Sequence, residues 1–282
     1  MNYLTNTLNN YSLSQNFTVS PLLLSKISLL IEPKTDIVLD IGAGKGAITE
    51  LLTSKFKQVV AIEPDLQLSK GLREHFQRKI VVETKEFSSN DIPNEKFSVV
   101  ANIPFRNTAY ILNTLLQTPN FTYGLIIMQK EAADKFAGQQ IDAKRTLLSS
   151  QYEVGFTFDV VIHCKPTDFR PVPKVSIVVM EMKQREASLV GASEKAQYND
   201  FLAYSFNKSV PIIKRAFANL SDNNLASRVV SSLTTQELLK LYDLTKNYAS
   251  VYRGYAVKIN AEKNTVQKVF RTRNDHNWRS AN

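Results

Sequence analysis

The sequence predicts an α/β fold in which a Rossmann-like sheet is followed by a small all-α domain. Three observations carry this prediction. Short β-rich runs alternate with helical patterns between Asp36 and Met182, most of the runs are continuously apolar, and apolar residues recur at three- and four-residue spacing after Met182. Alternation of strands and helices predicts a doubly wound sheet, and continuously apolar strands are typical of a sheet covered on both faces.

Seven runs fit buried strands, and helical patterns separate most of them. In chain order they are DIVLDI (36–41), QVVAIE (58–63), KIVVE (79–83), FSVVANI (97–103), YGLIIMQ (123–129), FTFDVVI (156–162) and KVSIVVMEM (174–182). The fourth run is expected beside the first, because the order of a doubly wound sheet reverses there.

A polar segment rich in small residues, KQREASLVGASEKAQ (183–197), is interpreted as a linker. We therefore predict two domains, 1–182 and 183–282. Three segments of the second domain have helical spacing with Ser, Thr and Asn at cap positions: 198–220, 225–233 and 234–244. The tail from Asn264 is basic and has no clear periodicity.

Composition excludes several classes of protein. The 282 residues are 43% hydrophobic, and no run of about 18 apolar residues occurs, so no membrane span is expected. The N-terminal segment lacks the pattern of a secretory signal. Cys164 is the only cysteine, which excludes an internal disulfide, and with three scattered histidines no metal cluster is expected. The prediction is a cytoplasmic monomer without a metal.

The net charge of +9 is concentrated near the C-terminus. Residues 1–182 hold 19 Lys and Arg against 18 Asp and Glu, whereas residues 183–282 hold 16 against 8. A basic excess confined to one part of a chain indicates a polyanionic partner such as nucleic acid, although a merely soluble basic surface would have the same composition.

The segment DIGAGKGAIT (40–49) follows a predicted strand and opens a predicted helix. Gly42 and Gly44 allow a sharp turn and a close approach to a ligand, and the following helix presents free N–H groups. Glu63, at the end of the next strand, is placed to accept both hydroxyls of a ribose. These features predict an adenosine-containing cofactor, nicotinamide or another, and the alternative is a tight turn that simply uses glycines.

Asn102-Ile103-Pro104-Phe105 lies at the carboxyl end of the fourth strand, in the crevice where ligands bind to such sheets. Following DIGAGKG, this segment resembles the N-[IL]-P-[FY] motif of S-adenosylmethionine-dependent adenine amino-methyltransferases, specifically the rRNA adenine N6-dimethyltransferases. The resemblance implies a class I methyltransferase fold, S-adenosylmethionine as cofactor and an exocyclic adenine amine as substrate.

That chemistry suits the four residues. The adenine amine is a poor nucleophile because its lone pair is delocalised into the ring. The Asn102 amide oxygen and the Ile103 carbonyl would accept its hydrogens and aim the lone pair at the methyl group. Pro104 would fix the turn, and Phe105 would stack on the base. Catalysis would then rest mostly on positioning.

Further segments resemble the erythromycin-resistance (Erm) enzymes and their KsgA-type small-subunit relatives. SQNFTVSP (14–21) is similar to a family signature, which implies that Gln15, Asn16 and Phe17 close over the cofactor. In FRPVPKV (169–175), Phe169 would contact the adenine opposite Phe105, although the segment equally fits a rigid Pro-bounded loop. The chain departs from the family twice: Glu86 stands where an Asp usually meets the cofactor adenine, and Ser176 follows FRPVPKV where Asp is common.

The substrate adenine must be unpaired or flipped out of its helix. The basic C-terminal domain is expected to bind RNA phosphates without reading sequence. Trp278 in the tail is the less favoured candidate, for a stacking contact. Four candidate phosphate-binding residues are Lys208, Lys214, Arg215 and Arg228.

Three features resemble the Erm branch: the phenylalanine of NIPF, the loop DIGAGKG and the segment DFRPVPKV. They imply mono- or dimethylation of an adenine in 23S rRNA and resistance to macrolides, lincosamides and streptogramin B. The alternatives are a KsgA-type 16S rRNA dimethyltransferase and a non-catalytic RNA-binding factor on the same fold. A nicotinamide-dependent oxidoreductase is disfavoured because no suitable His, Tyr or Lys constellation is present.

Overall fold

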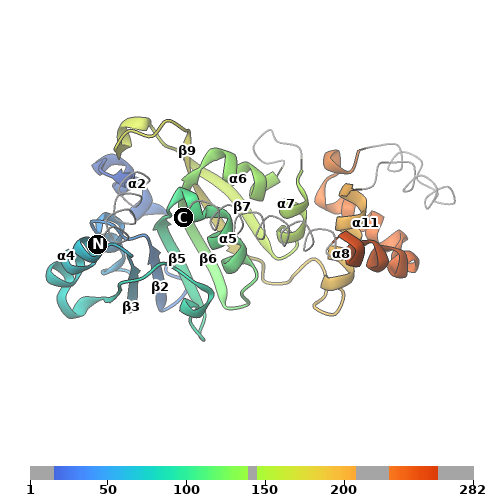
Figure 1. The fold of residues 1–282 in the computed structure, drawn as a ribbon, viewed down its shortest axis with the longest axis horizontal. Coiled ribbons are helices and arrows are strands. Elements are labelled where there is room, and N and C mark those ends of the chain that lie inside the picture. Colours follow the sequence, from blue (N-terminus) through green and yellow to red (C-terminus); the bar gives the residue numbers. More distant parts are fainter. Residues whose placement is uncertain (1–15, 139–144, 208–228, 260–282) are drawn as a thin grey trace, which may run out of the picture. The chain divides into compact units, whose positions relative to one another are not determined.

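A seven-stranded sheet forms the core of the first of two units in the computed structural model, which describes residues 16–138, 145–207 and 229–259 (Figure 1). Its strands are β2 (Ile37–Ile41), β3 (Gln58–Ile62), β4 (Val81–Glu83), β5 (Phe97–Asn102), β6 (Phe121–Gln129), β7 (Phe156–His163) and β9 (Ile177–Gln184). The order across the sheet is β4-β3-β2-β5-β6-β9-β7. Each strand falls on one of the seven predicted runs, and the predicted Rossmann-like α/β fold is confirmed.

The pairing of the strands is parallel from β4 to β6. β9 lies between β6 and β7 and is antiparallel to both. Figure 1 shows β3, β2, β5 and β6 side by side. β2 is therefore flanked by β3 and β5, as the sequence predicted for the first and fourth strands, and the carboxyl ends of these three strands meet at one edge of the sheet.

Helices cover both faces of this sheet. The first unit contains α2 (Pro21–Leu30), α3 (Ala47–Leu52), α4 (Leu66–Phe76), α5 (Thr108–Leu116) and α6 (Lys130–Ala137). Side chains of α2, α3 and α4 share one apolar cluster with Val38 and Val100 of the sheet. Leu39 and Val99 are equally buried but lie outside that cluster, because successive side chains of a strand point to opposite faces. Both faces are therefore packed.

Short-range signals in the sequence explain where several helices begin. α2 starts at Pro21, and the Ser20 hydroxyl accepts a hydrogen bond from the N–H of Leu23 at 3.2 Å. α4 follows Asp65, whose carboxylate accepts from the N–H groups of Gln67 and Leu68. Each cap satisfies N–H groups that lack partners within the helix.

Several short elements complete the first unit. β1 (Phe17–Thr18) pairs antiparallel with β8 (Phe169–Arg170), forming a separate two-stranded sheet. One-turn 3-10 helices complete this part of the chain: η1 (Gln77–Lys79), η2 (Ser89–Asp91), η3 (Phe105–Asn107) and η5 (Pro166–Asp168).

The described residues of the second unit are helical or irregular. Its elements are α7 (Leu147–Tyr152), α8 (Lys195–Asn207), η6 (Val230–Ser232), α11 (Thr235–Leu244) and η7 (Lys246–Tyr248), followed by a helix over 249–259. Thr234 caps α11 in a reciprocal arrangement with Glu237. The apolar cluster of this unit centres on aromatic side chains, among them Tyr198, Phe201 and Tyr242.

The structure divides the chain differently from the predicted boundary at 182/183. The first unit extends to Glu186, and residues 145–154, which the sequence analysis assigned to the first domain, pack with the second. A buried ion pair explains this. The Arg145 guanidinium pairs with Glu153 and donates to the Leu233 carbonyl at 2.8 Å, while the Thr235 hydroxyl donates to Glu153 at 2.8 Å.

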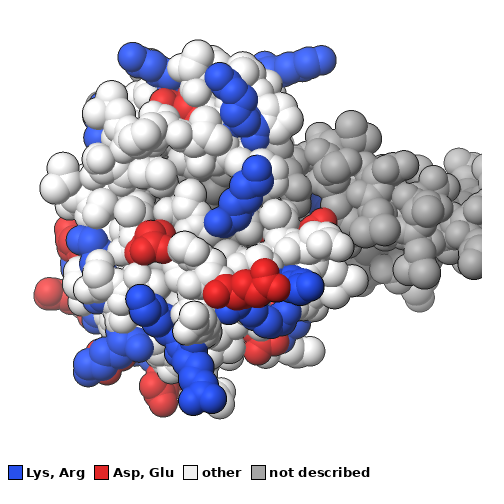
Figure 2. Space-filling view, turned by 90° about the vertical axis from the view of Figure 1, so that its left-hand side faces the viewer, with Lys and Arg blue, Asp and Glu red and all other residues white. Residues whose placement is uncertain are grey.

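Charges of both signs are interspersed on the face that Figure 2 shows. Many cations of the first unit are paired with carboxylates, for example Lys57 with Asp36 at 2.8 Å and Lys85 with Asp91 at 2.7 Å. This distribution agrees with the near balance of charge in residues 1–182. Within the described ranges, no helix is long and apolar enough to cross a membrane.

Candidate functional site

A pocket lies at the carboxyl ends of β2, β3 and β5. Of the predicted cofactor- and substrate-binding residues, those that line it are Asn16, Phe17, Gly42, Gly44, Glu63, Glu86, Asn102, Ile103, Pro104 and Phe105. Segments from five places in the sequence are thus brought to one site. Gln15 lies outside the described residues, as do Lys208, Lys214, Arg215, Arg228 and Trp278.

The glycine loop between β2 and α3 forms the floor of this pocket. Gly42 and Gly44 have φ angles of +78° and +57°, in the left-handed region that favours glycine. A Cβ atom would lie 3.1 Å from the Pro104 ring at Gly42 and 3.0 Å from the Phe17 ring at Gly44. The loop therefore packs against Pro104 on one side and against Phe17 of β1 on the other, and larger side chains do not fit at either position.

Glu63 directly follows β3 and is 2% exposed. One carboxylate oxygen accepts from the N–H of Gly44 at 2.8 Å, and the other accepts from the N–H of Asp65 at 3.0 Å. Burial raises the pKa of the Glu63 carboxyl, and the two N–H donors act against that rise. Each oxygen keeps a second lone pair, so the carboxylate is fixed in place and still able to accept from ribose hydroxyls.

Asp40 also lines the pocket and was not among the predicted site residues. Its carboxyl is 1% exposed; Oδ2 accepts from the Thr49 hydroxyl at 2.6 Å, and Oδ1 has no partner among the described residues. Burial and the charge of Glu63 raise the pKa of Asp40 to about 7, with the Thr49 hydrogen bond opposing them. A charged residue inside an otherwise apolar strand, directly before a glycine loop, is the signal that identifies it.

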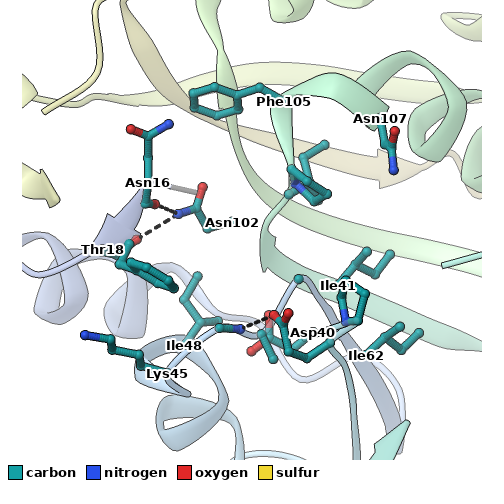
Figure 3. Close-up of a pocket in the computed structure, with 18 of the residues that line it drawn as sticks. Asn16, Thr18, Asp40, Ile41, Lys45, Ile48, Ile62, Asn102, Phe105 and Asn107 are labelled. Carbon is teal, nitrogen blue, oxygen red and sulfur yellow. Dashed lines mark hydrogen bonds between the residues drawn. The ribbon is translucent and has the colours of Figure 1, made fainter. Parts of the chain in front are cut away.

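Asn102 ends β5, and contacts with Asn16 and Thr18 fix its side-chain amide. The amide nitrogen Nδ2 donates to the Asn16 carbonyl at 2.7 Å and to the Thr18 hydroxyl at 3.3 Å. Figure 3 shows both bonds and the amide oxygen pointing away from Asn16 and Thr18. The amide is therefore oriented before any ligand binds.

The rest of the NIPF segment forms a rigid turn. The N–H of Ile103 donates to the Ile127 carbonyl at 3.3 Å, which continues the pairing of β5 with β6 by one residue. Pro104 then caps η3, and its carbonyl accepts from the N–H of Asn107 at 3.0 Å. Phe105, the first residue of η3, lines the pocket beyond Asn102 (Figure 3).

The N-terminal and β4 sides complete the pocket wall. The Lys45 ammonium lies 5.2 Å from the centre of the Phe17 ring, a cation–π distance. Glu86 accepts a hydrogen bond from the Arg106 guanidinium at 2.9 Å. This contact joins the segment after β4 to the turn after β5.

Phe169 does not line the pocket, and the structure corrects the role predicted for it. Its side chain is 0% exposed and belongs to the apolar core of the first unit. The neighbouring Arg170 lines the pocket instead. In extended backbone adjacent side chains point to opposite sides, so β8 buries Phe169 as it presents Arg170.

No group of three His, Cys, Asp or Glu side chains that could hold a metal occurs among the described residues. Asp40, Glu63 and Glu86 place three acidic side chains around one cavity, which suits a ligand that carries positive charge and hydroxyl groups.

The chain is similar to several known proteins. The family model described as ribosomal RNA adenine dimethylase matches residues 6–251. Ribosomal RNA small subunit methyltransferase A of Mycoplasmopsis pulmonis is 28% identical over 252 residues, covering 86% of this chain and 92% of that protein. The rRNA adenine N-6-methyltransferase of Bacteroides fragilis is 31% identical over 211 residues, covering 73% of this chain and 78% of that protein.

The fold has a solved counterpart. The crystal structure of the 23S rRNA methyltransferase ErmE matches with a TM-score of 0.69 and 23% identity, covering 82% of this chain and 100% of that one. The likeness shows that both share the class I methyltransferase fold. Because the family model covers most of the sequence, the resemblance noted from the motifs is confirmed, and the chain belongs to the ribosomal RNA adenine dimethylase family.

Proposed function

We propose that the protein transfers one or two methyl groups from S-adenosylmethionine to N6 of an adenine in 23S rRNA, and thereby confers resistance to macrolides, lincosamides and streptogramin B. The observation that carries this proposal is the Asn102–Phe105 turn, which borders a pocket built from the glycine loop and Glu63. We further propose that the protein acts in the cytoplasm as a monomer.

The residues around the pocket fit this cofactor. S-adenosylmethionine supplies a methyl group activated by a positively charged sulfonium. Glu63 would accept the ribose hydroxyls, and Glu86 would accept from the adenine amine of the cofactor. Gly42 and Gly44 leave room for close approach, and the unpartnered Oδ1 of Asp40 offers an acceptor beneath the loop.

The turn after β5 would hold the substrate adenine. Both N–H bonds of the Asn102 amide are directed at Asn16 and Thr18, so its oxygen remains to accept a hydrogen from the exocyclic amine. The Ile103 carbonyl would accept the second hydrogen, and Phe105 would stack on the ring. No general base is required in this scheme, because the nitrogen loses its proton after transfer.

The RNA would be held by the basic C-terminal part of the chain. Residues 183–282 carry 16 Lys and Arg against 8 Asp and Glu, and Lys208, Lys214, Arg215 and Arg228 are the proposed phosphate contacts. Such contacts orient an RNA without specifying its sequence. We expect methylation to weaken steeply as salt concentration rises.

A second candidate is methylation of 16S rRNA in the small subunit. It is favoured by the match to small subunit methyltransferase A of Mycoplasmopsis pulmonis, which covers 92% of that protein. The large-subunit proposal rests on the residues of the NIPF, DIGAGKG and DFRPVPKV segments. The two candidates share the pocket and differ in the RNA that is delivered to it.

The deciding experiment incubates the protein with labelled S-adenosylmethionine and, separately, naked 23S rRNA, naked 16S rRNA and 30S subunits. Label in N6-methyladenine of 23S rRNA alone supports the proposal, and label only in 30S particles overturns it in favour of the second candidate. The control is Asn102→Ala, which should bind cofactor and transfer methyl at least a hundredfold more slowly. Expression of both proteins in a macrolide-sensitive bacterium tests the resistance role.

A further inference from the structure

The side-chain amide of Asn102 is held from one direction only, by two residues of the N-terminal segment. Nδ2 lies 2.7 Å from the Asn16 carbonyl and 3.3 Å from the Thr18 hydroxyl. These partners precede Asn102 by 86 and 84 residues. We propose that Thr18 is a positioning residue, whose hydroxyl locks the Asn102 amide in the orientation that methyl transfer requires. The inference rests on the role proposed above for Asn102.

The chemistry of the partners determines which amide atom faces which way. The Asn16 carbonyl can only accept hydrogen bonds, so it requires Nδ2 opposite it; the reverse orientation would bring two acceptors within 2.7 Å. With one hydrogen directed to Asn16, the second is directed to Thr18. The oxygen Oδ1 must then point away from β1 (Figure 3).

The Thr18 hydroxyl adds what the Asn16 carbonyl alone cannot supply. A single hydrogen bond leaves the amide free to rotate about its own side-chain bonds, whereas two bonds to different atoms define its plane. Thr18 is 8% exposed, so water does not replace its hydroxyl easily. Positioning of the groups around the reacting atoms lowers the barrier to transfer.

β1 is itself anchored, which makes it a firm support for this contact. Thr18 pairs with Phe169 and Phe17 with Arg170 across the two-stranded sheet, and the N–H of Val19 donates to the Asp168 carbonyl at 2.9 Å. Backbone atoms form these anchoring bonds. Removing the Thr18 hydroxyl should therefore loosen the amide and leave the strand in place.

The test compares Thr18→Val, which keeps the shape of the side chain but removes the hydroxyl, with Thr18→Ser, which keeps the hydroxyl. We expect Thr18→Val to lower kcat about tenfold, the effect of one orienting hydrogen bond, with KM for cofactor and RNA within about twofold of wild type. Thr18→Ser should restore most of the rate. A matched control is Thr35→Val. The Thr35 hydroxyl donates to the Ile37 carbonyl and shares a hydrogen bond with the Ser98 hydroxyl, at the amino ends of β2 and β5 and away from the pocket. Loss of this hydroxyl should not change kcat.

Two further readouts separate this proposal from the function itself. In an Asn102→Ala background, Thr18→Val should cause no additional loss of rate, because the group that it orients is absent. Hydrogen exchange of the Asn102 side-chain amide, measured by NMR without substrate, should accelerate in Thr18→Val and not in Thr18→Ser. Unchanged exchange together with wild-type kcat in Thr18→Val overturns the positioning role. Absence of methyl transfer by the wild type would overturn the proposed function, and the exchange measurement would still decide the role of Thr18.

Discussion

Replacement of Asp40 by Asn should stabilise the protein, and by an amount that depends on pH. In the folded protein the pKa of Asp40 rises from 3.8 to about 7, chiefly because the carboxyl is buried beneath the glycine loop. Between these pH values the folded state retains a proton that the unfolded state has released. Stability therefore falls as pH increases through this range, and the full loss is present above the folded pKa.

The size of the effect follows from the two pKa values. Each pKa unit corresponds to about 1.36 kcal/mol, so ionised Asp40 lowers the free energy of unfolding by about 4 kcal/mol above neutral pH relative to a permanently neutral side chain. The difference in free energy of unfolding between Asp40→Asn and wild type should be near zero at about pH 3, apart from a constant contribution of the new amide. It should grow by about 2 kcal/mol between about pH 5.5 and pH 8.5.

Urea unfolding of both proteins at several pH values measures this difference. Asp36→Asn is the matched control, because Asp36 lies just before the same strand and its side chain is 65% exposed; its difference from wild type should stay within about 0.5 kcal/mol across the range. A constant difference for Asp40→Asn between about pH 5.5 and pH 8.5 would refute the reasoning.

Three further predictions follow from the site and the second unit. Asn102→Ala should keep cofactor affinity within about threefold and lower kcat at least a hundredfold, as measured by calorimetry and labelled methyl transfer. Asn102→Asp should be no more active, because it sets a carboxylate oxygen against the Asn16 carbonyl. Near wild-type transfer by either variant would exclude the role of the amide. Gly44→Ala should weaken cofactor binding at least tenfold in equilibrium dialysis, because its Cβ would lie 3.0 Å from the Phe17 ring in a left-handed backbone; unchanged affinity would contradict the fitted loop. Arg145→Met should lower the free energy of unfolding by about 3–5 kcal/mol, because it leaves the Glu153 carboxylate buried without its cation. Urea unfolding measures this change, and a decrease of less than about 1 kcal/mol would show that water reaches Glu153.

Strands with continuous apolar runs were predictable, because burial on both faces leaves a direct trace in the sequence. β2 and β5 lie within a residue of their predicted bounds, and the glycine loop and NIPF segment follow them as expected. β6 begins two residues before its predicted start, at Phe121, since strand ends depend on pairing with neighbours. The antiparallel direction of β9 could not be predicted in this way, because the direction of a strand depends on the segment that connects it to its neighbours and not on its own residues.

Features that the sequence did not predict depend on contacts between segments far apart in the chain. β1 and β8 are two residues each, too short for any periodicity, so the burial of Phe169 and the exposure of Arg170 to the pocket could not be read from FRPVPKV. The role of Thr18 depends on a contact across 84 residues. The placement of 145–154 in the second unit likewise depends on Leu233 and Thr235, far along the chain.

The interleaving of the two units constrains the order in which the chain can mature on the ribosome. Arg145 and Glu153 emerge early, before β7 and β9 complete the sheet, whereas Leu233 and Thr235 are synthesised about 80 residues later. Until those partners arrive, the ion pair must remain hydrated, because burial without them is costly. Closure of the helical unit is therefore a late event in biosynthesis. A fragment cut after the sheet would carry residues 145–154 as an unfolded loop within an otherwise complete methyltransferase core.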